Sequence, residues 1–258
     1  MPETTLNITA IPAFQDNYIW LFKTAGNACA VVDPGDADPV LEVLEEQRLN
    51  LSCILLTHHH YDHADGVAAL LERHKATVFG PMDDRLPIVH RVCREGDQIH
   101  LPGLDVNFKV LEVPAHTRSH IAFYTHNVLF CGDTLFSLGC GRFFEGTASD
   151  MQRSLDKIAA LPADTLVYCA HEYTQANSRF ALAVEPGNTT LRTRASAIER
   201  LRASGKITLP SRLGDELAMN PFLRTREGSV VDAARKIDPE AGPGIATMAV
   251  IRAWKDRF

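Results

Sequence analysis

The segment at residues 57–63, with the sequence THHHYDH, constrains the fold of this chain more than any other feature. It follows the apolar run at 53–56 and precedes a helical pattern at 64–74. The sequence therefore predicts a strand that feeds a polar loop, and a helix that the loop opens. In layered α/β proteins, functional side chains are commonly presented by such loops.

Two metal half-sites are predicted within this segment. In an extended or turning backbone, His58 and His60 project to the same side, so that two imidazoles can face one ion. Asp62 and His63 follow after the chain has bent and can supply an oxygen and a nitrogen to a second ion. The alternative is an exposed histidine run or an expression tag. A tag would lie at a terminus with no acid inside it, so we favour the metal site.

Two half-sites need further ligands from elsewhere in the chain. Three candidates each follow a β-type run, namely His116, Asp133 and His171. Any one of them alone would be interpreted as an ordinary loop or capping residue. Their shared position at strand ends favours a common site. The six cysteines include no C-x-x-C pair, so neither a disulfide framework nor a zinc ribbon is indicated.

Short β-type runs and helical patterns alternate over roughly the first two thirds of the chain. The β-type runs include 18–23, 28–32, 53–57, 106–113, 127–131 and 165–169, and the helical patterns are 38–48, 64–74 and 149–160. This alternation predicts an α/β layered domain. After His171 the sequence favours helices, at 175–184, 189–203 and 246–255. We therefore expect one domain at 1–172 and a second, helical domain at 173–258.

Composition narrows the class of partner. The 258 residues, 45% of them hydrophobic, suffice for one large domain and a smaller appendage. The net charge is −6 and the charged residues mix both signs, so nucleic acid is disfavoured as a partner. The first ten residues do not have the pattern of a secretory signal, and no apolar run reaches the ~18 residues of a spanning helix. We expect a cytoplasmic monomer with no membrane partner.

The pattern T-H-x-H-x-D-H, followed by strand-end His, Asp and His, resembles the metallo-β-lactamase superfamily. Within it, the chain is similar to the glyoxalase II family at GDTLF (132–136), GCGRFFEGT (139–147) and HEYT (171–174). The similarity extends from IPAF at 11–14 to WKDRF at 254–258, which is nearly the whole chain. The resemblance implies an α/β fold of the αββα sandwich type with the site at one edge. It also implies a C-terminal helical domain that helps to bind glutathione.

The resemblance implies a binuclear metal centre whose seven ligands are all present. The first ion would be held by His58, His60 and His116, the second by Asp62, His63 and His171, and Asp133 would bridge the two. Mixed His/Asp sites accept several divalent ions, so we expect Zn²⁺, with iron or manganese as alternatives. The two carboxylates of the set, Asp62 and Asp133, are also assigned catalytic roles.

The implied reaction is the hydrolysis of S-D-lactoylglutathione, or another 2-hydroxyacyl thioester, to glutathione and D-lactate in methylglyoxal detoxification. Two cations ~3.5–4 Å apart would lower the pKa of a bridging water toward neutrality and deliver hydroxide to the thioester carbonyl. Because a thiol has a pKa of ~8.5, the thiolate leaves without a strong general acid.

The substrate's glutathione portion carries two carboxylates, which an acidic protein must meet with locally placed cations. Arg142 follows the aspartate segment, and Arg252 and Lys255 lie three apart in a helical pattern, hence on one face. The resemblance implies the same positions, with Tyr173 beside His171 and Phe144 where some relatives have tyrosine. The alternative for Arg252 and Lys255 is that they complement the dipole of a helix C-terminus.

Three other functions fit the sequence less well. A mononuclear iron persulfide dioxygenase would share the first metal motif but would need one iron and oxygen. A serine hydrolase would need a G-x-S-x-G elbow, which the sequence lacks. A structural metal site normally has four protein ligands, many of them sulfur atoms, whereas the proposed ligands here include no sulfur. The second half-site and the long helical region favour the hydrolase.

Overall fold

Backbone contacts divide the chain into two units in the computed structural model, which describes residues 6–86 and 88–258. We call them the N-terminal unit, Met1–Glu112 with Ser119–Gly132, and the C-terminal unit, Val113–Arg118 with Asp133–Phe258. Proposed metal ligands occur in both. Within the described residues, no helix is long and apolar enough to cross a membrane.

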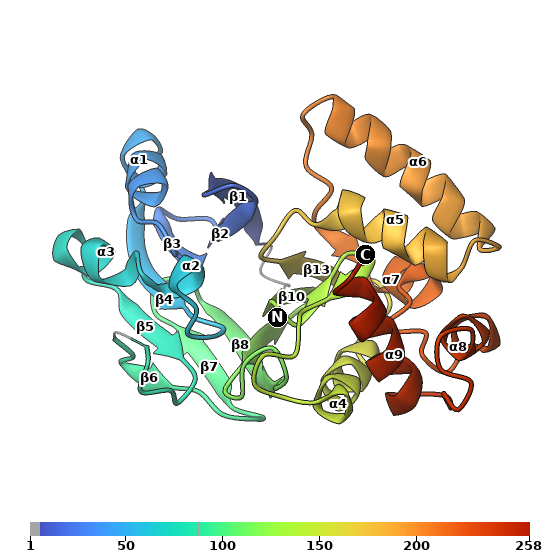
Figure 1. Ribbon diagram of the computed structural model, residues 1–258. Helices are drawn as coiled ribbons and strands as arrows, with labels where there is room; N and C mark the ends of the chain where they lie inside the picture. The colour runs from blue at the N-terminus through green and yellow to red at the C-terminus, as the bar shows by residue number, and fades with distance from the viewer. Residues whose placement is uncertain (1–5, 87) are drawn as a thin grey trace. The chain divides into compact units, whose positions relative to one another are not determined.

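The N-terminal unit contains a mixed six-stranded sheet in the order β1-β2-β3-β4-β5-β6 (Figure 1). Its first three strands are antiparallel and the rest are parallel. The strands are β1 (Asn7–Ala13), β2 (Asn17–Lys23), β3 (Ala28–Val32), β4 (Asn50–Leu55), β5 (Thr77–Gly80) and β6 (Arg91–Val92). Helix α1 (Asp38–Glu46) connects β3 to β4, while α2 (Tyr61–Ala64) and α3 (Val67–Arg73) connect β4 to β5. These crossovers confirm the α/β alternation predicted from the sequence.

A second layer of strands in this unit is antiparallel. Neighbouring strands pair in the order β10-β9-β8-β7. They are β7 (Gln98–Leu101), β8 (Val106–Glu112), β9 (Ile121–Thr125) and β10 (Val128–Gly132). Phe22 of β2 stacks on Phe130 of β10 with ring centroids 5.3 Å apart, and it lies 5.5 Å from Phe108 of β8. The two layers of strands therefore face each other across an aromatic core.

The other face of the six-stranded sheet is covered by helices. Because successive side chains of a strand point to opposite faces, Ile19 and Leu21 turn away from the Phe22 side. They join one buried cluster with Val40 and Leu44 of α1 and with residues of α3. The N-terminal unit is thus layered as helices, sheet and sheet.

The helix predicted at 64–74 is interrupted in the structure. Helix α2 ends at Ala64 and α3 begins at Val67. Between them, Gly66 packs so tightly on the β3–α1 connection that an added Cβ would lie 2.5 Å from the carbonyl oxygen of Pro34. This contact fixes the turn that follows the histidine segment, and it depends on a residue distant in sequence.

The C-terminal unit is mostly helical, as predicted for the end of the chain. A hairpin of β11 (Leu135–Phe136) and β12 (Gly139–Cys140) is followed by α4 (Ala148–Ala159) and by the antiparallel pair β13 (Leu166–Cys169) and β14 (Ser211–Arg212). The remaining helices are α5 (Thr174–Val184), α6 (Thr189–Ala203), α7 (Leu213–Met219), α8 (Gly228–Arg235) and α9 (Ile245–Lys255). Helices α5 and α6 lie side by side (Figure 1), with Ala181, Leu191 and Ile198 in one buried cluster.

All six cysteines are buried as free thiols. Burial raises the pKa of the Cys29 thiol to about 12 and that of Cys53 and Cys93 to about 11. Burial likewise raises the pKa of Cys140 to about 11, and that of Cys169 is raised further. These residues serve as small apolar side chains, as the sequence indicated.

Candidate metal centre

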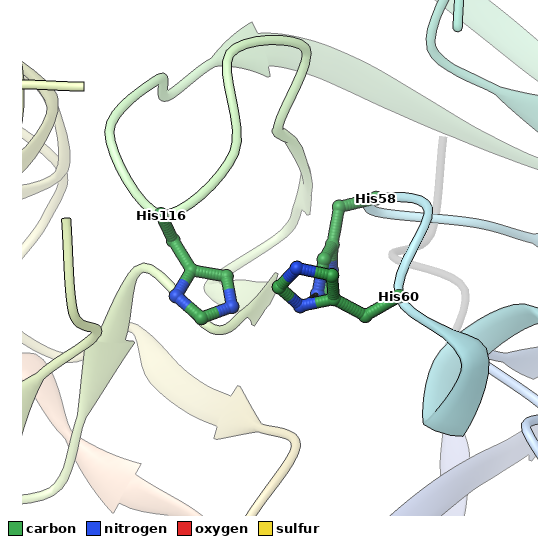
Figure 2. A group of neighbouring side chains, drawn as sticks. All are labelled: His58, His60 and His116. Carbon is green, nitrogen blue, oxygen red and sulfur yellow. Dashed lines mark hydrogen bonds between the residues drawn. The ribbon is translucent and has the colours of Figure 1, made fainter. Parts of the chain in front are cut away.

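The histidine segment lies where predicted, between the end of β4 and the start of α2. His58 and His60 lie on this one segment (Figure 2), and His58 is fully buried. The Nε2 atom of His58 lies 3.1 Å from the Nδ1 atom of His60. Two ring nitrogens at this distance can direct their lone pairs to one cation.

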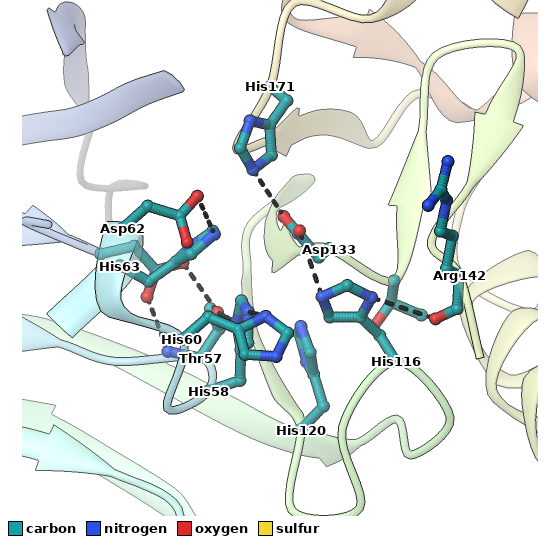
Figure 3. A network of polar contacts seen from close by, with 12 residues as sticks. Thr57, His58, His60, Asp62, His63, His116, His120, Asp133, Arg142 and His171 are labelled. Atoms are coloured by element: carbon teal, nitrogen blue, oxygen red, sulfur yellow. Dashed lines mark hydrogen bonds and ion pairs between the residues drawn. The ribbon is translucent and has the colours of Figure 1, made fainter. Parts of the chain in front are cut away.

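Asp62 and His63 form the second part of the segment. Oδ2 of Asp62 lies 3.5 Å from Nε2 of His63 (Figure 3). Asn17 donates its side-chain amide to the same Oδ2 at 2.9 Å. Gly35 packs against the Asp62 backbone so closely that a Cβ there would lie 2.0 Å from its carbonyl oxygen. The carboxylate is therefore held both through its oxygen and through its main chain.

Asp33 orients both halves of the segment. It is 4% exposed and directly follows β3, and its Oδ1 accepts from the Thr57 backbone N–H at 2.8 Å. Its Oδ2 accepts from the Thr57 hydroxyl at 2.7 Å and lies 3.2 Å from His63 Nδ1. The Thr57 hydroxyl lies 3.0 Å from His58 Nδ1. Because a carboxylate only accepts, these bonds leave Nε2 of His58 and of His63 as the lone-pair atoms.

Asp33, His58 and His63 also form a geometric group whose ligand atoms lie within 4.8 Å of one another. Three donors already occupy the Asp33 oxygens, however. A carboxylate held in this way supports the ligand rings, which is the usual role of a partner behind a metal-binding histidine. We therefore assign Asp33 to the support of the ligands.

In the C-terminal unit, the carboxylate of Asp133 lies between two imidazoles. Its Oδ2 lies 3.3 Å from Nε2 of His116, and its Oδ1 lies 3.3 Å from Nε2 of His171 (Figure 3). The other nitrogen of His116, Nδ1, lies 3.0 Å from the carbonyl oxygen of Arg142 and donates to it. One carboxylate with a different imidazole at each oxygen is the donor set that a bridging ligand requires.

The donor set of both halves fits divalent cations of borderline hardness. Every proposed ligand atom is an imidazole nitrogen or a carboxylate oxygen, and His58, His63, His116, Asp133 and His171 are buried. Buried imidazole and carboxylate groups with supporting hydrogen bonds are typical of Zn²⁺, Fe and Mn sites.

The expected substrate-binding residues lie in the C-terminal unit, and some of them contact its proposed metal ligands. The exposed ring of Phe144 has its centroid 5.2 Å from that of His116. Tyr173 stacks on His171 at 4.7 Å with nearly parallel rings. Arg142 lines a cavity of about 460 Å³, together with Phe144, Arg252 and Asp256.

Arg252 and Lys255 differ in their surroundings. Arg252 is 6% exposed, donates to the carbonyl oxygen of Cys140 at 2.8 Å, and pairs with Asp256 at 3.0 Å. Lys255 lies over the ring of Phe180. Burial, and then the charge of Arg252, lower the pKa of Lys255 to about 8. Of the two, Arg252 is the more firmly fixed in the fold.

Several supporting residues were not predicted from the sequence. Asp33 stands before Pro34 and Gly35, a pattern typical of a turn. Its position directly after a strand, as with Asp133, is the signal that could have identified it. Asn17 offered no comparable signal, because its contact with Asp62 joins residues 45 apart.

Two protein-family models together match nearly the whole chain. A family model described as "Metallo-beta-lactamase superfamily" matches residues 13–171, and one described as "Hydroxyacylglutathione hydrolase C-terminus" matches residues 172–258. The hydroxyacylglutathione hydrolase of Aeromonas hydrophila is 52% identical over 97% of this chain and 99% of its own length. This chain belongs to the hydroxyacylglutathione hydrolase family.

Other members of the hydroxyacylglutathione hydrolase family are equally similar over their full length. The relative from Pseudomonas fluorescens is 50% identical over 98% of this chain and 100% of its own. Among solved structures, ETHE1 from Myxococcus xanthus aligns over 97% of this chain and 98% of its own with a TM-score of 0.65 and 23% identity. BLEG-1, a B3 metallo-β-lactamase, aligns over 85% of this chain and 99% of its own with a TM-score of 0.63 and 21% identity. The family and the metallo-β-lactamase fold predicted from the sequence are confirmed.

Proposed function

We propose that this protein hydrolyses S-(2-hydroxyacyl)glutathione thioesters, with S-D-lactoylglutathione as a substrate, to glutathione and a 2-hydroxy acid. The observation that carries the proposal is the combination of full-length identity near 50% to hydroxyacylglutathione hydrolases with a carboxylate, that of Asp133, set between two buried imidazoles. This would be the second step of methylglyoxal detoxification.

The proposed cofactor is a pair of divalent ions, Zn²⁺ in the first place with Fe or Mn as alternatives. The assignment of His58, His60 and His116 to one ion, Asp62, His63 and His171 to the other, and Asp133 to both is supported by the donor geometry within each unit. One solved relative, 29% identical over 64% of this chain, is described as TTHA1623 in a di-iron-bound form. Ions bound here would activate a water molecule as the nucleophile and polarise the thioester carbonyl.

The residues of the chain would perform the remaining tasks. Asp33 and Thr57 keep the imidazoles of His58 and His63 in the tautomer that offers Nε2. Arg142, Arg252 and Lys255 would meet the carboxylates of glutathione, with Tyr173 and Phe144 lining the approach beside the ligands. We propose residues 1–172 as the catalytic domain and 173–258 as the substrate-binding domain, in a protein that acts as a cytoplasmic monomer.

The test is thiol release from S-D-lactoylglutathione by the purified protein, together with elemental analysis. We expect two ions per chain, and activity that a strong chelator removes and that added metal restores. The variant Asp133→Ala should lose both the bound ions and the activity. The control is Asp232→Ala, whose side chain is 71% exposed. Uncatalysed rates with both ions bound would show the proposal to be wrong. Oxygen consumption with glutathione persulfide would instead support the dioxygenase.

A further inference from the structure

The segment at 133–142, which we call the ligand hairpin, connects two parts of the proposed centre. It begins with Asp133, runs through β11 and β12, and ends with Arg142. Its base is closed where Gly141 donates its backbone N–H to Thr134 at 3.2 Å. A Cβ on Gly141 would lie 2.0 Å from the carbonyl oxygen of Asp133, so the two strands touch there.

The base of the ligand hairpin sets two proposed ligands at once. Asp133 supplies its carboxylate directly. The carbonyl oxygen of Arg142 accepts from Nδ1 of His116 and so fixes the orientation of that ring. A shift of the hairpin along its own axis would therefore move a carboxylate and rotate an imidazole together.

The tip of the ligand hairpin is held by polar side chains of the helical segment. Leu138 has a φ of +58°, and its backbone N–H donates to Oε2 of Glu216 at 2.7 Å. Asn220 donates to the carbonyl oxygens of Phe136 and Gly139 at 3.1 and 3.0 Å, and to the same Glu216 oxygen at 3.1 Å. Apart from the bond between Asn220 and Glu216, these bonds join the hairpin to helix α7 or to the residue that follows it.

Glu216 is an unexpected residue at this place. It is 1% exposed, and burial raises the pKa of its carboxyl. Burying an acid is costly unless it accepts hydrogen bonds, and an apolar side chain would fill the same space at lower cost. A buried acid 78 residues away in sequence, aimed at a left-handed backbone N–H, indicates a requirement for the position of that backbone.

We propose that Glu216 is a positioning residue, which sets Asp133 and the His116 ring by holding the tip of the ligand hairpin. The inference rests on the proposed function, because the position of the hairpin matters in this way only if Asp133 and His116 bind metal. It gives the C-terminal segment a second role beside substrate binding. Leu138 adopts its left-handed backbone at a cost that the Glu216 bond offsets.

The test compares Glu216→Met, which removes the acceptor, with Glu216→Gln, which keeps one. For Glu216→Met we expect metal retention against a chelator to weaken about 10-fold, the lower end of the effect of losing a group bonded directly to a ligand, because Glu216 acts through the hairpin backbone. We expect kcat to fall in the same variant, because Asp133 and the His116 ring move with the hairpin. Glu216→Gln should restore both quantities to near the values of the unmodified protein.

The matched control is Glu185→Met. Glu185 is also a buried acid of the helical segment, 5% exposed, but it pairs with Arg224 and Ser229. We expect Glu185→Met to lower the melting temperature at least as much as Glu216→Met does, and to leave metal retention unaltered. If Glu216→Met does not fold, Asn220→Ser takes its place, with the same expected pattern.

Unaltered metal retention in the folded Glu216→Met or Asn220→Ser protein overturns the inference, and so does equal metal loss in Glu185→Met. The outcome is independent of the substrate assignment. A protein that retains its ions but releases no thiol contradicts the proposed function, while the metal measurements still decide the role of Glu216.

Discussion

Replacing Asp33 by asparagine is expected to weaken both proposed metal half-sites of the histidine segment, although the substitution removes no ligand. The direction of the new amide is dictated by the backbone. The N–H of Thr57 donates to Oδ1 at 2.8 Å, so the amide oxygen must take that position. The amide NH₂ then faces the Thr57 hydroxyl and Nδ1 of His63, where the Oδ2 acceptor had been.

Two imidazole tautomers are expected to invert as a result. The NH₂ donates to Nδ1 of His63, so the proton of that ring moves to Nε2. The Thr57 hydroxyl now accepts from the amide and turns its own proton toward Nδ1 of His58, which lies 3.0 Å away. His58 therefore also becomes protonated at Nε2. In both rings, the nitrogen expected to bind metal then carries a proton and no longer offers a lone pair to the ion.

The size of the effect follows from the supporting role of Asp33. Loss of such a partner typically costs about 10- to 100-fold in metal affinity, or roughly 1.4–2.7 kcal/mol at each ion. The free energy of unfolding of the metal-free protein should fall by less, about 1 kcal/mol. The side chain keeps its shape, and only charge-assisted hydrogen bonds weaken.

The assay is a competition titration with a chromophoric chelator, combined with urea unfolding of the metal-free protein. The matched control is Glu185→Gln, which also replaces a buried carboxylate by an amide of the same shape. The Glu185 side chain contacts Arg224 and Ser229. We expect Glu185→Gln to bind metal normally. If Asp33→Asn binds two ions with unaltered affinity, the tautomer argument is refuted.

Two further effects are expected. The affinity for S-methylglutathione, measured by calorimetric titration, should fall as the pH rises from 7 to 9. Lys255 loses its charge in this range, because its pKa is lowered to about 8. The variant Lys255→Arg, which keeps its charge, should abolish this pH dependence. Gly141→Ala should destabilise the fold by about 1–3 kcal/mol in urea and reduce metal content, since its Cβ would meet the Asp133 carbonyl oxygen at 2.0 Å. Gly242→Ala, where a Cβ meets nothing within 4 Å, should leave both quantities unaltered.

The parts of the site that could be predicted are those encoded by local sequence. Successive members of the set His58, His60, Asp62 and His63 are adjacent or have one residue between them, so the loop itself brings their side chains together. The fold class could also be predicted, because strand and helix patterns alternate along the chain. Local periodicity is sufficient for both conclusions.

The roles of the supporting residues could not be predicted, because these roles arise from contacts between distant segments. Asp33 acts on Thr57, 24 residues away, and Glu216 acts on Leu138, 78 residues away. Arg252 shows the same limit. Its helical spacing placed it with Lys255, but its bond to the Cys140 carbonyl spans 112 residues and also gives it a role in holding the hairpin.

The six buried thiols have a consequence for a protein that would release glutathione at each turnover. Thioesters pass their acyl group to thiolates, and glutathione disulfide exchanges with thiolates, so a reactive cysteine would be modified by the protein's own substrate and product pool. Here every cysteine is buried, and burial raises the pKa of Cys29, Cys53, Cys93 and Cys140 to about 11 or 12. These thiols stay protonated near neutral pH, which keeps the chain free of acyl and glutathionyl adducts in a thiol-rich environment.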